Sequence, residues 1–411
     1  MTLTHQAVDT APPPRSPLEV LQTVPAAKEP ESRELHIEFT GSGSEYFRIW
    51  IVNLLLTLAT LGLYLPWAKV RRLRYFYANT LVDSDPLHFH GAPLQMFKGF
   101  VIVIAGFALY SLASEFSPTV GSLAFLVVAA LWPLLFRSSM CFRLANTSWR
   151  GLRFAFAGSK KDAYLVWLPL LLPSTGLLLL YLVVPAFPDP SQNTELTWHL
   201  PLAFGCFMLG SIGGVPWLLY RLKSYQHRNY CFSSETTVFT TPLSDYFGTA
   251  LGCVFMVLLA SIAFALGILI TEGISGAVVR VINKDSLIKV VLDLIMQTPV
   301  VIFSYSLLIS YAVTRFQTLA WNGTHSQNIQ FTSTLGFDSM MKLTVKNWLL
   351  TVLSLGLYWP YAKVAMTRLR LESVRVQSSV DPAQWMAAPS LAQGSAMGDA
   401  SGDFFGFDVG L

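Results

Sequence analysis

The chain has 411 residues, of which 53% are hydrophobic and only 13% are charged, about half the charged fraction of a typical soluble protein. The mean hydropathy is +0.49, and the formal net charge is +4. A soluble protein of this size could not cover its surface with so few charged side chains, so the composition predicts a chain solvated mainly by lipid. The small net charge argues against a nucleic-acid-binding protein.

The two ends of the chain differ in composition from the rest. Residues 1–33 are polar and rich in proline, and residues 376–411 are rich in Ala, Ser and Gly and contain no Lys or Arg. We predict that both ends are disordered, although Phe404, Phe405 and Phe407 could dock on the rest of the protein. The integral membrane domain is then predicted to occupy residues 34–375.

Six apolar runs are long enough to cross a bilayer as helices. Each holds roughly 19–25 residues, which fits a hydrocarbon core of ~30 Å at a rise of about 1.5 Å per residue. The predicted spans are residues 97–115, 118–136, 163–187, 198–220, 246–270 and 290–313. Two shorter runs, at 49–66 and 343–360, each end in an LGLYxP sequence, where glycine and proline are expected to break a helix.

Two internal repeats indicate how these runs are organised. The segment Asn53–Val70 matches Asn347–Val364, with 11 identical residues after the asparagine. A shorter pattern of alternating residues that ends in Gly, Thr or Ser predicts a strand and a turn before an apolar run. It begins at Glu34, Pro86, Gly151, Glu235 and Ser326. We therefore predict an all-α polytopic membrane protein, built of repeated transmembrane helical hairpins with short cytoplasmic strand-turn elements between them.

The motifs also carry a family resemblance. The segments Gly41–Thr80 and Asn146–Ser159 resemble the YjgN family of bacterial inner-membrane proteins, which is defined by a domain of unknown function. The resemblance covers about residues 39–375, and the two long tails depart from the family pattern. It implies a multi-pass protein of the bacterial inner membrane, and it implies no established activity, ligand or catalytic residue.

Charge between the spans predicts their orientation. Residues 68–98 hold five Lys and Arg and residues 137–161 hold six, whereas the connections at 115–118 and 188–197 hold none. The strand-bearing loops are therefore predicted to be cytoplasmic and the short connections periplasmic. Residues 271–289, which carry three cations, are the exception and are expected to form an interfacial helix.

The two short runs leave two topologies open. If they are re-entrant hairpins, the chain has six full spans and both termini are cytoplasmic. If they cross the membrane, it has eight spans and both termini are periplasmic. The repeats favour the hairpins, because these place all five strand units on one side, and helix breaks at membrane depth are tolerated when they are buried in protein.

Four polar residues in the apolar runs form a candidate intramembrane site. Asn53 and Asn347 occupy matching places in the long repeat, where they either form hydrogen bonds between helices or bind a substrate near the midplane. Asp293 and Gln297 are four residues apart and share a helical face, so Asp293 is a candidate proton or cation site. The alternative is that Asp293 lies at the periplasmic interface and pairs with Lys289.

Cations beside aromatic rings follow both LGLYxP sequences. This combination suits the headgroup level of a membrane, where rings tolerate the interface and cations attract anionic lipid. The helices either anchor the topology or form a specific pocket for a lipid headgroup or another anion, so membrane lipids with anionic headgroups are the predicted partners. The candidate lipid-interface residues are Trp67, Lys69, Arg71, Arg72, Arg74, Lys363, Arg368 and Arg370.

Several motifs are missing from the sequence. It contains no GxxxxGK[ST], HExxH or GxSxG motif, and its four cysteines form no CxxC pair. We therefore expect no metal, no cofactor and no enzymatic activity. Transport of a small solute or ion is the favoured function, on the strength of the repeats and broken helices; a structural or lipid-interacting role is the alternative, favoured by the basic and aromatic helices. Convergence of the four polar residues on one cavity would favour transport.

Overall fold

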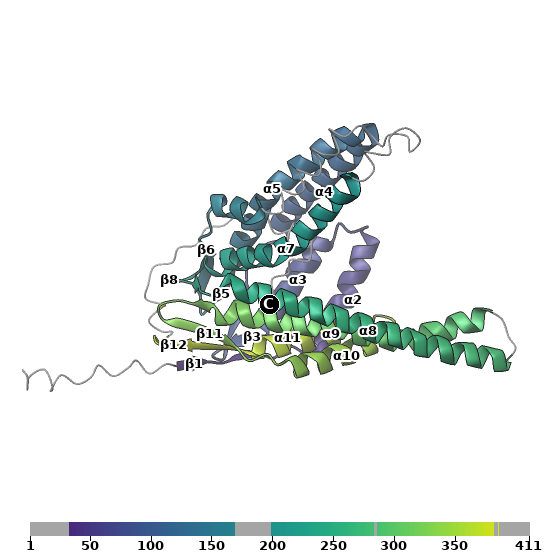
Figure 1. The fold of residues 1–411 in the computed structure, drawn as a ribbon. Coiled ribbons are helices and arrows are strands. Elements are labelled where there is room, and N and C mark those ends of the chain that lie inside the picture. Colours follow the sequence, from purple (N-terminus) through teal and green to yellow (C-terminus); the bar gives the residue numbers. More distant parts are fainter. Residues whose placement is uncertain (1–32, 169–198, 283–285, 382–384, 386–411) are drawn as a thin grey trace, which may run out of the picture.

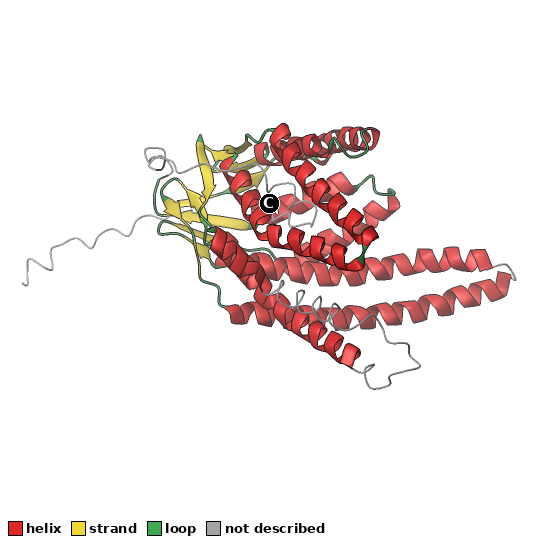
Figure 2. Ribbon diagram, turned by 90° about the horizontal axis from the view of Figure 1, so that it is seen from above, coloured by secondary structure: helices red, strands yellow, loops and turns green. Residues whose placement is uncertain are grey.

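A computed structural model describes residues 33–168, 199–282, 286–381 and 385. Most of these residues are helical, as predicted for a membrane protein, but the all-α class is incomplete because the strands assemble into two antiparallel sheets. The strands gather at one end of the molecule, and the helices extend away from them (Figures 1 and 2).

Each sheet is built from strands that are distant in the sequence. The first, in spatial order, consists of β1 (Arg33–Leu35), β12 (Val374–Ser378), β11 (Ile329–Ser333), β10 (Thr324–His325) and β9 (Val238–Phe239). The second consists of β2 (Ile37–Phe39), β3 (Thr80–Val82), β4 (Asp85–Phe89), β5 (Thr147–Trp149), β6 (Leu152–Phe156), β7 (Tyr230–Phe232) and β8 (Glu235–Thr236).

The two sheets continue into each other at both ends. Only His36 separates β1 from β2, and its carbonyl accepts a hydrogen bond from the amide of Asp83 at 2.9 Å. Only Thr237 separates β8 from β9, and its amide donates to the carbonyl of Tyr230 at 2.9 Å. The strands of the described chain therefore form a closed ring. Among the described strands, only the short strands β1, β2, β8 and β9 have a single paired neighbour, so closure leaves little strand edge to pair with another molecule.

One apolar cluster fills this ring. Its buried strand residues come from both sheets, and partly buried residues of β2, β3, β6 and β7 pack against them, which places the cluster inside the ring. The indole of Trp385 joins it, with its centroid 6.4 Å from that of Trp149 and 5.6 Å from the Phe232 ring. The strand residues at its centre are Leu35, Leu87, Phe89, Trp149, Ile329 and Val376.

In the described chain, helices lie between successive strands of the ring. Each described return is closed by pairing of the strands before and after the helices, for example Phe39 with Thr80, Phe89 with Thr147 and Ser333 with Val374. The helices are α2 (Gly43–Ala59), α3 (Leu65–Ala78), α4 (Pro93–Phe116), α5 (Pro118–Ala145), α7 (His199–His227), α8 (Leu243–Ile282), α9 (Ser286–Asn322), α10 (Phe337–Leu353) and α11 (Trp359–Glu372). Residues 160–168 are also helical.

Four helices of the described chain are long and apolar enough to cross a membrane: Pro93–Phe116, Thr119–Ala145, Leu243–Val278 and Lys289–Asn322. They correspond to the predicted spans at 97–115, 118–136, 246–270 and 290–313. The predicted span at 198–220 falls in α7, and most of the one at 163–187 lies outside the described residues.

Two predicted segment boundaries differ from those in the structure. Residues 271–282, expected in an interfacial helix, continue α8 without a break. At the C-terminal side, β12 runs to Ser378 and Trp385 is buried, so the folded region extends beyond the expected boundary at residue 375. Strand pairing with β1 and β11 supplies the reason, because it orders residues that have no helical pattern.

The LGLYxP sequences form helix-ending turns. In the first, α2 ends at Ala59, and Gly62 has a φ of +91°. In the second, α10 ends at Leu353, and Gly356 has a φ of +92° while its amide donates to the carbonyl of Thr351 at 2.8 Å. Each short run is thus two helical arms around a turn.

Replacing Gly356 by Ala should destabilise the protein. The site has room for a methyl group, with nothing within 4 Å, so the cost of about 1–2 kcal/mol comes from the positive φ alone. The measurement is the melting temperature in detergent, and the control is Gly248→Ala in α8, which also adds a methyl group in open space but at a helical residue. Equal melting temperatures for both variants would contradict this account of the turn.

Candidate functional site

Asn53 and Asn347 are buried and tie together the two arms of their own hairpins. The side-chain amide of Asn53 in α2 donates to the carbonyl of Ala68 in α3 at 3.4 Å. The amide of Asn347 in α10 donates to the carbonyl of Ala362 in α11 at 3.3 Å. Each bond joins residues 15 apart, so the two asparagines hold matching turns in the same geometry.

Asp293 and Gln297 lie in a different hairpin, formed by α8 and α9. The hydroxyl of Ser275, which is fully buried, donates to the Asp293 carboxylate. Asp293 is 29 residues from the end of α9 at Asn322, or about 43 Å along the helix, so this pair lies far from the ring of strands. Two pockets of the described chain have known linings, and neither lining includes Asp293, Gln297, Asn53 or Asn347.

Six of the eight predicted lipid-interface residues do not line a common pocket, and three of these six form hydrogen bonds to neighbouring hairpins. Arg74 donates to the carbonyl of Gly91 at 3.1 Å, Arg368 donates to those of Phe39 and Gly41, and Arg370 donates to Gln317 at 2.8 Å. These three arginines join neighbouring hairpins.

Three further predicted interface residues lie outside the pocket. Trp67 packs near Phe97, Lys69 is buried and Arg71 is exposed.

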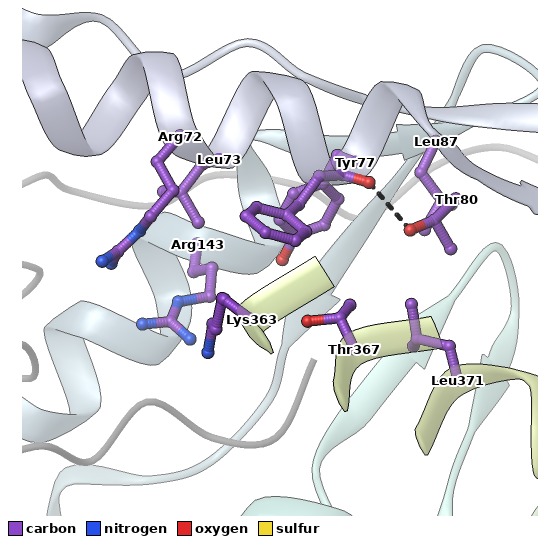
Figure 3. Close-up of a pocket in the computed structure, with 10 residues that line it drawn as sticks. Arg72, Leu73, Tyr77, Thr80, Leu87, Arg143, Lys363, Thr367 and Leu371 are labelled. Atoms are coloured by element: carbon purple, nitrogen blue, oxygen red, sulfur yellow. Dashed lines mark hydrogen bonds between the residues drawn. The ribbon is translucent and has the colours of Figure 1, made fainter. Parts of the chain in front are cut away.

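The other two predicted interface residues, Arg72 and Lys363, line a pocket between three hairpins. Arg72 comes from α3, Lys363 from α11, and a third cation, Arg143, comes from α5 (Figure 3). The three side chains project into the same region from separate helices. The enclosed volume is about 40 Å³, which suits a small polar group rather than a whole lipid.

The rest of the pocket wall is largely apolar. Three lining residues, Tyr77, Thr80 and Thr367, carry hydroxyl groups, and the Thr80 hydroxyl donates to the carbonyl of Phe76 at 2.8 Å. No acidic residue is among the described residues that line the pocket. Its apolar lining consists of Leu73, Phe76, Tyr77, Leu87 and Leu371.

Two arginines and a lysine in one partly apolar pocket favour an anion. Arginine presents several donors in a fixed plane that matches carboxylate and phosphate oxygens, and a desolvated wall strengthens such charge-assisted bonds. The sequence pattern places Arg143 only among the cytoplasmic loop charges and gives no sign of a role in a pocket. The structure shows that Arg143 lies in the last turn of an apolar helix and that only 8% of its surface is exposed, which identifies it as a pocket residue.

Two more basic groups are enclosed at the ring end of α7, outside the predicted span. Burial, reinforced by the Arg370 charge, lowers the pKa of Lys223 to about 8. Burial, reinforced by Lys223, holds the pKa of His227 well below its usual value. Thr324 donates its hydroxyl proton to the Ala320 carbonyl at 2.6 Å, so it accepts a hydrogen bond from Nδ1 of His227 at 2.8 Å. His227 is therefore neutral and fixed.

Acid should destabilise the protein through His227. Since the pKa of His227 is lower in the folded state than in the unfolded chain, only the unfolded chain binds a proton as the pH falls below about 6.5. The loss approaches about 1.4 kcal/mol per pH unit. Melting temperatures between about pH 7.5 and pH 5.5 should fall more steeply for the wild type than for His227→Asn, while His88→Asn, at an exposed position, should follow the wild type. The same slope for all three proteins would refute this role.

Apolar helices that leave and re-enter a ring of strands, with cations enclosed where they meet it, define a membrane protein with an internal basic pocket. The comparisons with known proteins agree with a membrane protein. The chain belongs to the family of bacterial proteins of unknown function DUF898, whose model matches residues 34–404. The resemblance predicted from the motifs is thus confirmed.

Similar proteins include inner membrane proteins of two bacteria. The chain is 26% identical to inner membrane protein YjgN of Salmonella typhimurium over 360 residues, which cover 84% of this chain and 88% of that protein. It is 34% identical to inner membrane protein YjgN of Escherichia coli O157:H7 over 136 residues, which cover 33% of this chain and 34% of that protein. No solved structure matches this chain. The activity of the family is not established.

Proposed function

We propose that this chain is a multi-pass inner-membrane protein that binds the phosphoryl group of an anionic lipid in the basic pocket. In this proposal it is not an enzyme, and the ring of strands and both termini lie in the cytoplasm. Five hairpins enter the membrane from that side. Three of them supply the six full spans, and the two with LGLYxP turns are re-entrant.

Helix lengths support this topology. At about 1.5 Å per residue, the 24 residues of α4 extend about 36 Å and can cross a hydrocarbon core of ~30 Å. The 17 residues of α2 and the 14 of α3 extend only about 25 and 21 Å. Strand pairing between Phe39 and Thr80 returns this hairpin to the side from which it started.

The composition of the pocket is the observation that supports a phosphoryl ligand. Arg72, Arg143 and Lys363 converge from three hairpins on a space walled by leucine and aromatic side chains. A phosphoryl group offers several oxygens to such cations. Lipid is the favoured source because the turns that join the arms of the two LGLYxP hairpins carry exposed leucines, including Leu61 and Leu355, each 94% exposed, which suit a hydrocarbon environment.

Transport of a small solute or ion is the second candidate. One observation favours it, namely the Asp293 carboxylate and its buried Ser275 partner within a long apolar hairpin. The separation of this pair from Asn53 and Asn347 favours lipid binding instead, because a shared cavity would be expected of a transport site.

Arg72→Gln should weaken binding of a short-chain phosphatidylglycerol by the purified protein about tenfold, since a hydrogen bond to a charged group contributes roughly 1.5 kcal/mol or more. Arg71→Gln is the matched control: it removes the same charge from the neighbouring, exposed position of the same helix. Phosphatidylcholine of equal chain length should bind weakly to all three proteins. Binding can be measured by isothermal calorimetry.

Inorganic phosphate distinguishes the source of the phosphoryl group. Tight binding of phosphate, lost in Arg72→Gln, would identify free phosphate as the ligand and refute the lipid. Equal phosphatidylglycerol affinity for Arg72→Gln, Arg71→Gln and the wild type would refute the pocket as the binding site.

A further inference from the structure

A row of polar side chains crosses the outer face of the ring on the strands β4, β5 and β6. Leu87 and Trp149 belong to the apolar cluster inside the ring, so the residues that alternate with them point outward. Ser148 of β5 lies directly opposite His88 of β4 and Arg153 of β6. Directly opposed strand residues share a face, so these three side chains are neighbours on the outside. The basic pocket lies on the other side of this wall, because Leu87 lines it.

Two further basic side chains extend the row towards the helices. His90 follows His88 at strand spacing, and its Nε2 shares a hydrogen bond with the Ser148 hydroxyl at 2.7 Å. Arg74 of α3 donates to the carbonyl of Gly91, the next residue after His90, at 3.1 Å. Only 4% of Ser148 is exposed, whereas His90 is exposed. The hydroxyl is therefore held in a fixed place beneath basic side chains from α3, β4 and β6, which we call the outer basic patch.

No carboxylate of the described chain balances the outer basic patch. Burial lowers the pKa of His90, and the charges of Arg153, His88 and Arg74 lower it further. All three of these neighbours are basic. Among the described residues, Arg153 and His88 have neither an ion-pair partner nor a side-chain hydrogen bond. Arg153 is also exposed, so its guanidinium donors are available to a ligand from solution.

We infer that the outer basic patch binds the phosphoryl group of a phosphate monoester. Such a group has three acceptor oxygens and carries a charge of about −1.5 to −2 at pH 7. The Arg153 guanidinium matches two oxygens in a bidentate contact, and the Ser148 hydroxyl and the His90 imidazole supply donors for the rest. The site is separate from the basic pocket and does not rest on the function proposed for it.

Binding of the anion is coupled to protonation of His90. In the free protein, the pKa of His90 lies below its usual value because of burial and of Arg153, His88 and Arg74. An adjacent anion raises this pKa, so the bound protein holds an additional proton between the two values. The affinity therefore increases as the pH falls, by at most about tenfold per pH unit for one proton. Protonated His90 donates to the Ser148 oxygen, which leaves the hydroxyl proton for the ligand.

Titration calorimetry with inorganic phosphate tests the patch in the full-length protein. Arg153→Gln should weaken phosphate binding about tenfold, because it removes a bidentate charge-assisted contact. Arg375→Gln is the matched control, since Arg375 is an exposed strand residue of the other sheet and pairs with Glu34 at 3.7 Å. Equal affinities for the two variants, or no phosphate binding by the wild type, would overturn the inference.

The basic pocket is distinguished by Arg72→Gln. Phosphate binding that persists in Arg72→Gln and is weakened by Arg153→Gln belongs to the outer basic patch. Phosphate binding that is lost in Arg72→Gln and unchanged in Arg153→Gln would assign the anion to the pocket and overturn the patch. Binding of short-chain phosphatidylglycerol, a diester, should depend on Arg72 and not on Arg153.

Sulfate tests the role of His90, because this ligand stays a dianion over the whole range of the measurement. Its affinity for the wild type should rise between about pH 7.5 and pH 5.5 and should rise less steeply for His90→Asn. The same slope for both proteins would refute the coupling of binding to His90.

Two monoesters distinguish the source of the phosphoryl group. Equal affinities for glycerol 3-phosphate and short-chain phosphatidic acid would identify a soluble phosphate monoester. Binding of phosphatidic acid that is at least about tenfold tighter, and is weakened by Arg153→Gln, would identify a lipid headgroup. Both results support the site, and failure of both compounds to bind would overturn it.

Discussion

Closure of the strand ring is the constraint on which the rest of the structure depends. Isolated strands of two to five residues would not be stable, and an open sheet would present unpaired edges. The breaks at His36 and Thr237 let the two sheets continue into each other, so every strand of the described chain gains at least one hydrogen-bonded partner. Pairing of the strands before and after the helices then obliges each described hairpin to return to the ring, whatever the length of its arms.

The same geometry creates the basic pocket. Helix pairs that start side by side on a ring must diverge as they extend, and Figure 1 shows α4 and α5 separating from α8 and α9. Close to the ring, α3, α5 and α11 remain near enough for Arg72, Arg143 and Lys363 to share one space. Arg368 and Arg370 are bound to neighbouring hairpins, which fixes the position of α11 relative to the others. Pocket and ring are therefore consequences of one arrangement.

The sequence predicted the elements with strong local patterns. The apolar runs of α4, α5, α8 and α9 were recognisable from hydropathy, and alternation identified strands such as β4, β6 and β11. Strands such as β3 and β10 are at most three residues long. They were missed because pairing with neighbouring strands, rather than local propensity, orders them. The glycine and proline of LGLYxP predicted a helix break, but only the structure shows at which residues the helices on either side of the turn end and begin. Arg72 and Lys363 were chosen for their basic and aromatic neighbours, and their convergence with Arg143 depends on long-range packing that no local pattern encodes.

The side of the membrane on which the ring lies tests this account most directly. Single cysteines at Ser84 and Ser234, both in exposed turns of the ring, and at Phe116, at the far end of α4 and 86% exposed, can be labelled in whole cells with a membrane-impermeant thiol reagent after removal of the native cysteines. The account predicts that residue 116 reacts from outside, and that residues 84 and 234 react only after the inner membrane is permeabilised. Reaction of residues 84 and 234 from opposite sides of the membrane would contradict a ring to which every hairpin returns.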